Sequence, residues 1–95
     1  MYSLHFTNSA KKELKRIDRH NQVFIVHSLD EFISNFSDDY ETILISKGKI
    51  KRLQGQKEIL YRLRLRSYRI IYKKYADTLV ILVLNISTRE GAYKF

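Results

Sequence analysis

The sequence contains no cysteine, no proline and only three glycines. The missing cysteine excludes disulfides and thiol chemistry and fits a reducing compartment. The longest apolar run, residues 79–84, is far too short to span a membrane. The first residues lack the basic region and apolar stretch of a signal peptide. We therefore expect a cytoplasmic protein with no membrane partner.

The sequence also lacks the residues that several kinds of active site require. The three histidines, His5, His20 and His27, lie in the N-terminal half, and no Asp/Glu cluster has metal-ligand spacing. We find no Ser–His–Asp arrangement, phosphate-binding glycine loop or nucleotide fingerprint. The sequence therefore indicates neither a metal nor another cofactor.

The charge is strongly asymmetric. The whole chain carries +8, yet residues 1–46 hold five Lys and Arg against seven Asp and Glu, whereas residues 47–95 hold thirteen against three. Such a concentration of positive charge in the C-terminal half favours a partner rich in phosphates or carboxylates. The alternative is an ordinary soluble basic surface.

The first 36 residues predict a strand and two helices. Tyr2, Leu4 and Phe6 alternate with polar residues, as in a short strand, and residues 7–9 supply helix N-cap candidates. Apolar residues then recur at helical spacing twice, the second time from about residue 21 to residue 36. The short polar link between the two stretches predicts an antiparallel helical hairpin.

The remainder predicts strands. We interpret residues 40–56 as a connecting loop with some local structure. From Ile59 the apolar period is two, and turns at Ser67 and residues 75–77 divide the rest into three strands, the last apolar enough for burial on both faces. Consecutive strands joined by short turns form an antiparallel meander. We therefore predict one α+β domain over residues 1–95.

The predicted meander carries a row of cations. Arg62, Arg64 and Arg66 alternate with Tyr61, Leu63 and Leu65, which places three guanidinium groups on one face, about 6–7 Å apart. Arg69 follows on the next strand, Arg89 ends the third, and Tyr93 lies four residues beyond. Guanidinium groups match phosphate oxygens, and fixed cations stabilise the charge that develops when RNA is cleaved. The alternative is the solvent face of a half-buried sheet.

The order of several short motifs resembles the RelE/ParE toxin superfamily over nearly the whole chain. These motifs are Tyr2-x-Leu4-x-Phe6-Thr7, Ala10-x-x-Glu13-Leu14, Leu53-x-Gly55, Tyr61-Arg62-Leu63-Arg64, Tyr68-Arg69-Ile70-Ile71-Tyr72 and Arg89-x-x-x-Tyr93. The resemblance implies a four-stranded antiparallel sheet packed on two helices. It also implies a RelE-like, metal-independent endoribonuclease that cuts messenger RNA in the ribosomal A site by attack of the 2′-OH.

The resemblance assigns roles to matching residues. Arg62 and Arg64 match two basic residues of the first meander strand, and Arg69 matches an arginine that stabilises the transition-state phosphate. Arg89 matches a residue proposed to assist the leaving oxygen, and Tyr93 one that stacks on RNA or helps to activate the 2′-OH. We predict Arg64, Arg69, Arg89 and Tyr93 as catalytic. The predicted RNA-binding residues are Lys49, Lys51, Arg52, Arg62, Arg66 and Lys73.

The identity of the general base stays open. Arginine hardly deprotonates, and RelE has lysines where this chain has Arg62 and Arg64. Tyr93, Lys49 and Lys51 are the candidates. Relatives often carry histidine before the late arginine, where this chain has Thr88.

The resemblance also implies partners: a cognate acidic antitoxin, the ribosome and messenger RNA, with operator DNA bound only through the antitoxin complex. Two other functions fit the same motifs. One is a ParE-like inhibitor of DNA gyrase, which cuts no RNA. The other is a basic RNA-binding module without catalytic activity, or a degenerate toxin.

Overall fold

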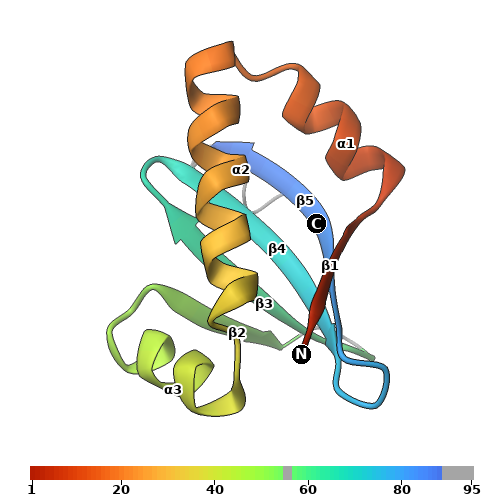
Figure 1. Ribbon diagram of the computed structural model, residues 1–95, viewed down its shortest axis with the longest axis vertical. Coiled ribbons are helices and arrows are strands. Elements are labelled where there is room, and N and C mark those ends of the chain that lie inside the picture. The colour runs from red at the N-terminus through yellow and green to blue at the C-terminus, as the bar shows by residue number, and fades with distance from the viewer. Residues whose placement is uncertain (55–56, 89–95) are drawn as a thin grey trace.

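The computed structural model describes residues 1–54 and 57–88, which form three helices and a five-stranded sheet (Figure 1). The sheet order is β1-β5-β4-β3-β2. No helix of the described ranges is long and apolar enough to cross a membrane. The elements are β1 Ser3–Phe6, α1 Asn8–Lys15, α2 Arg19–Ser34, α3 Asp38–Ser46, β2 Ile50–Gln54, β3 Ile59–Leu65, β4 Tyr68–Tyr75 and β5 Val80–Thr88.

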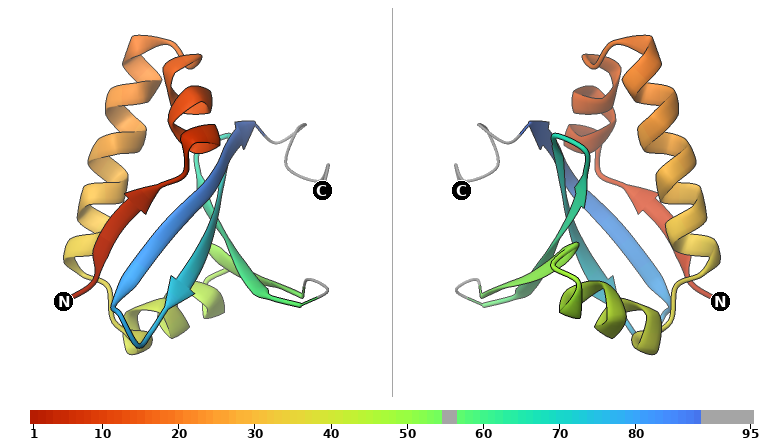
Figure 2. Two further views of the ribbon diagram at one scale, coloured as in Figure 1. Left: turned by 90° about the vertical axis from the view of Figure 1, so that its right-hand side faces the viewer. Right: turned by 90° about the vertical axis from the view of Figure 1, so that its left-hand side faces the viewer.

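The predicted helical hairpin is confirmed, and it covers one face of the sheet (Figure 2). Side-chain oxygens start both helices: Thr7 accepts from the backbone N–H of Ala10 at 3.1 Å, and Asp18 accepts from that of Asn21 at 3.2 Å. α2 buries Ile25, Leu29 and Phe32 against the sheet. The cationic side chains therefore lie on the opposite face of the sheet.

The α+β class is confirmed, but the sheet differs from the four-stranded antiparallel one expected. It has a fifth strand, β2, and β1 pairs with β5 in parallel, with Ser3 opposite Val80 and Phe6 opposite Val83. More than seventy residues separate these partners, so no turn fixes the direction of their pairing.

The segment expected to be a loop contains a helix and a strand. Ser37 accepts from the backbone N–H of Tyr40 and starts α3, whose first turn holds acidic residues that suit a helix N-terminus. Gly48, with a φ of 78°, follows the end of α3 and turns the chain into β2. β2 then pairs with β3 along its whole length.

β5 is buried mainly on one face, where Ile81, Val83 and Ile86 enter the core. Its other face is half-buried, so the expectation of burial on both faces was too strong. β1 is short, and beyond it α1 covers the free edge of β5: Glu13 accepts from the backbone N–H of Ile86 at 2.8 Å and from Asn85 Nδ2 at 2.7 Å. This contact satisfies an edge group that would otherwise be open to pairing.

Glu13→Ala should therefore destabilise the fold by about 1–3 kcal/mol, because it leaves partly buried donors on β5 without an acceptor. Urea unfolding followed by circular dichroism measures this change. Glu13→Gln keeps one acceptor oxygen and should cost less. Equal stability of the alanine variant and the wild type would show that the edge contact contributes nothing.

Candidate anion-binding site

The cationic face is organised by the pairing of β3 with β4. Arg64 lies directly opposite Arg69 in this pair, and Arg69 in turn lies opposite Ser87 of β5. Residues opposite one another in a ladder share a sheet face. Like charges in such positions are destabilising, so this arrangement favours an anionic ligand between the two arginines.

A pocket of about 320 Å³ opens at this place. We call it the anion pocket, and it is lined by Arg64, Arg66, Ser67 and Arg69. Three guanidinium groups and a hydroxyl around one hollow suit a phosphate, because arginine donates to phosphate oxygens in a planar fork. The predicted gathering of arginines is therefore present, with Ser67 added from the turn.

Arg69 is buried. Only 7% of the residue is exposed, and its Nε–H has no hydrogen-bond partner among the described residues. The hydroxyl of Ser87, opposite Arg69, is also buried and finds no partner in the same part of the chain. Buried polar groups without partners are rare in native structures. The two therefore mark a place where ligand binding could supply missing hydrogen bonds.

The predicted row of three arginines on one strand was wrong for its last member. β3 ends at Leu65, and Arg66 lies in the two-residue turn before β4 with a φ of 55°. Its guanidinium carbon lies 3.6 Å from the centroid of the Phe24 ring of α2, a cation–π contact. Arg66 therefore reaches the anion pocket from the turn and is held by a helix.

The other predicted RNA-binding residues are more widely spread. Lys51 lies opposite Arg62 on the cationic face, next to the anion pocket. Arg52 lies opposite Tyr61, whose ring stacks on core residue Tyr72, so Arg52 belongs to the other face. Arg52 thus lies on a different face from Lys51 and Arg62, and its RNA-binding role stays a prediction.

Lys73 and Lys49 do not line the anion pocket. Lys73 Nζ lies 2.7 Å from Glu58 Oε1, and this hydrogen bond, followed by the one to Tyr75, raises the pKa of Lys73. It lies four residues along β4 from Arg69, roughly 13 Å in an extended strand. The backbone carbonyl of Lys49 accepts from the N–H of Arg64 at 2.9 Å. Arg89 and Tyr93 lie outside the described residues.

Sequence reasoning missed Ser87, because a serine near the end of an apolar strand carries no signal by itself. Only its pairing with Arg69 gives it a functional position. Ser87 and the predicted arginines together form a site that can bind a phosphate and stabilise negative charge on its oxygens. The described part of the site contributes three arginines around one hollow, an arrangement suited to negatively charged groups.

Comparison with known proteins agrees with this architecture. The family model of the ParE toxin of type II toxin–antitoxin systems matches residues 4–93. A curated relative, the proposed toxin RelE1 of Methanocaldococcus jannaschii, is 46% identical over 48 residues. That match covers 50% of this chain and 52% of the relative, so it spans about half of each protein.

Two solved structures share the fold. The archaeal RelE–RelB complex from Pyrococcus horikoshii matches with a TM-score of 0.69 and 25% identity, over 96% of this chain and 98% of that chain. The E. coli RelBE toxin–antitoxin complex matches with a TM-score of 0.67 and 21% identity, over 93% and 96%. Since the family model spans nearly the whole sequence, the chain belongs to the ParE toxin family of type II toxin–antitoxin systems, within the RelE/ParE superfamily.

Proposed function

We propose that this protein is a RelE-like toxin that cleaves messenger RNA in the ribosomal A site. The observation that carries the proposal is the facing pair of Arg64 and Arg69 at the anion pocket. A gyrase inhibitor needs no phosphate site, whereas RNA cleavage does. The charge of +8 further suits a partner made of RNA.

In the proposed reaction the ribose 2′-oxygen attacks the neighbouring phosphorus and the bond from phosphorus to the 5′-oxygen breaks. The products are a 2′,3′-cyclic phosphate and a 5′-hydroxyl. Arg64 and Arg69 stabilise the charge that builds on the phosphoryl oxygens. A base takes the 2′-proton, with Lys49, Lys51 and Tyr93 as candidates. Arg89 stabilises the charge on the leaving 5′-oxygen, which takes a proton from water to become the 5′-hydroxyl.

The proposed partners follow from the relatives. The P. horikoshii and E. coli structures are complexes of RelE with RelB. We propose that a small acidic antitoxin likewise binds this chain and neutralises its cationic face. The complex would bind operator DNA through the antitoxin, and the free toxin would act on ribosomes in the cytoplasm.

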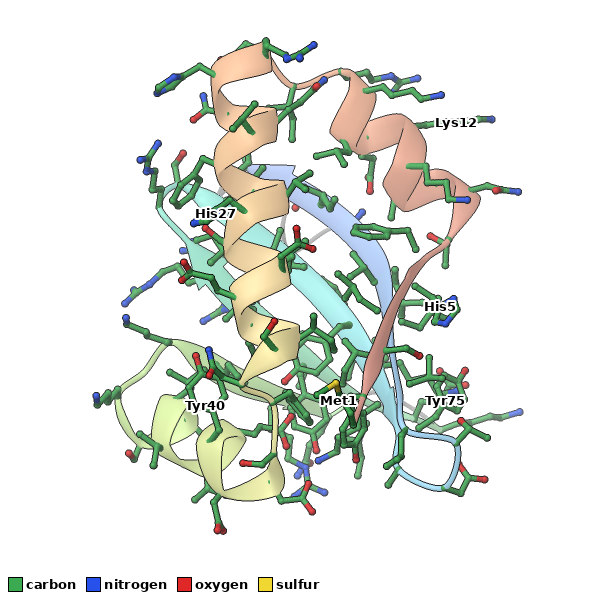
Figure 3. All side chains as sticks on the ribbon, viewed as in Figure 1. Met1, His5, Lys12, His27, Tyr40 and Tyr75 are labelled. Atoms are coloured by element: carbon green, nitrogen blue, oxygen red, sulfur yellow. The ribbon has the colours of Figure 1, made fainter. Side chains whose placement is uncertain are left out.

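Induced expression with primer extension on a translated message tests this function. Wild type should arrest growth and create new 5′ ends inside codons, and Arg64→Ala should reduce cleavage by about 10²-fold. Arg64 is exposed, so its loss should change stability little. Lys12→Ala is the matched control, because Lys12 is an exposed cation of α1 that does not line the anion pocket (Figure 3).

A second candidate function follows from the name of the matching family model, which is ParE. Growth arrest with intact messages and broken or unreplicated DNA would establish a gyrase inhibitor in place of the ribonuclease. Absence of arrest, together with RNA binding that weakens steeply with salt, would indicate a binding module or a degenerate toxin.

A further inference from the structure

A second pocket, of about 210 Å³, lies on the helix-bearing side of the sheet between α2, α3 and β3. Its lining residues come from α2, from α3, from Lys49 just after α3 and from the end of β3. We call it the base pocket. Its lining residues are Ser28, Glu31, Phe32, Tyr40, Leu44, Lys49, Leu63, Arg64 and Leu65.

The chemistry of its walls suits a flat, partly polar ligand. The floor is apolar, since Phe32, Leu44 and Leu63 are buried in the core. The half-buried ring of Tyr40 forms part of the wall and offers a stacking surface. An apolar floor with a few polar groups around it is typical of small-molecule sites.

The base pocket adjoins the anion pocket. Arg64 lines both, and its backbone N–H is bound to the carbonyl of Lys49, another residue of the base pocket. The pairing of β3 with β2 ends at Leu63, so Arg64 lies at a strand end between the two faces of the sheet. A ligand that fills both pockets therefore passes around this strand end, with a phosphate on the cationic face and a planar group on the helix-bearing face. A nucleotide of an RNA strand has this form.

Glu31 decides which group enters the base pocket. Its carboxylate repels a second phosphate, yet accepts hydrogen bonds from an amino group on a base edge, as carboxylates do from cytosine N4. Its contact with His27, 2.9 Å from Nε2 to Oε1, is an exposed one between side chains about 70% accessible, so it holds the carboxylate only weakly. The carboxylate is thus available to a ligand.

We propose that the base pocket takes the nucleobase beside the scissile phosphate and favours bases with an exocyclic amino group over uracil. Uracil presents carbonyl oxygens on both sides of its N3–H, and these repel the carboxylate of Glu31. This inference rests on the proposed ribonuclease function, and names a selectivity for the same substrate.

The test maps new 5′ ends across all messages after induction, for wild type, Glu31→Gln and Asp30→Asn. Both variants remove one negative charge from α2, but Asp30 does not line the base pocket. Wild type should avoid uracil at one position beside the cut. Glu31→Gln should raise cleavage at uracil-containing sites by about ten-fold, because a side-chain amide also donates to carbonyls. Asp30→Asn should keep the wild-type preference.

A second measurement needs no cleavage. Binding of cytidine and uridine monophosphate to the purified protein compares two ligands that differ in one amino group. Cytidine monophosphate should bind about ten-fold more tightly, and Glu31→Gln should remove this difference. If Glu31→Gln leaves the base preference at the cut unchanged and the two nucleotides bind equally well, the proposal of a base pocket is overturned. The proposal of a ribonuclease would still stand. Wild-type protein that cuts no message would overturn the ribonuclease, and the nucleotide comparison would still decide on the pocket.

Discussion

Arg69→Met is expected to abolish growth arrest and to leave the free energy of unfolding unchanged or higher. Arg69 is almost completely buried, its Nε–H has no hydrogen-bond partner within residues 1–54 and 57–88, and it faces the like charge of Arg64. Burying a charge without full pairing is costly, and an apolar side chain of similar length often removes that cost. Activity should fall by at least about 10²–10³-fold, as when one stabilising donor is lost from a transition state.

Growth after induction gives the activity, and urea unfolding gives the stability. Arg69→Lys serves as the comparison, because it keeps the charge but loses the planar fork that matches phosphate, so it should restore only part of the activity. A methionine variant that unfolds more easily would show that the guanidinium is structural. A methionine variant that still arrests growth would show that the phosphate binds at another place.

The regular parts of the fold could be predicted because their signals are local. The period-two pattern from Ile59 predicted β3, the Tyr- and Ile-rich stretch after the turn at Ser67 predicted β4, and the near-continuous apolar run that follows predicted β5. The spacing of apolar residues predicted the hairpin of α1 and α2. Thr7 was among the expected N-caps, and it holds that position. Each of these features depends on residues within a few positions of each other.

α3 and β2 could not be predicted, because their stability comes from distant contacts. The run Ile43-Leu44-Ile45 has no clear period, and only Leu44 of the three is buried. The other buried residue of α3 is Glu41, an acid, whose partners lie on β4. A buried carboxylate looks like a surface residue in the sequence, so the helix had no visible apolar face.

The site was predicted in composition and only partly in geometry. Arg64 and Arg69 were expected near each other, but strand register was needed to place them face to face and to add Ser87. Arg66 does not belong to the row of arginines on β3, because the turn begins one residue earlier than the alternation of arginine and apolar residues indicates. The assignments of Arg89 and Tyr93 remain predictions.

Glu41→Ala should destabilise the fold by about 2–4 kcal/mol, because it removes the acceptor of the buried Tyr72 hydroxyl and leaves the half-buried Lys74 with only the exposed Asp38, 3.4 Å away. Glu41 is 4% exposed and accepts from Tyr72 Oη and from Lys74 Nζ, each at 2.6 Å. It connects α3 to the centre of the sheet. Denaturant unfolding measures the loss, and Asp39→Ala is the matched control, since Asp39 is an exposed acid on the same helix.

The same cluster should make stability fall at alkaline pH. Burial, followed by the hydrogen bond to Glu41, raises the pKa of Tyr72 far above its usual value of 10.0. Burial lowers the pKa of Lys74, but the hydrogen bond and charge of Glu41 outweigh it, so that the pKa rises above 10.5. Groups whose pKa is higher in the folded state stabilise it fully below the unfolded value and lose that contribution as pH rises.

Stability should therefore be steady towards neutral pH and decline above about pH 10. Tyr72→Phe should flatten part of that decline, because it removes one of the two titrating groups. Glu41→Ala should also flatten part of it, since both raised pKa values depend partly on this carboxylate, whereas burial, the largest cause for Tyr72, remains. A glutamate variant within about 1 kcal/mol of wild type, with the same alkaline slope, would mean that α3 is held by apolar packing alone.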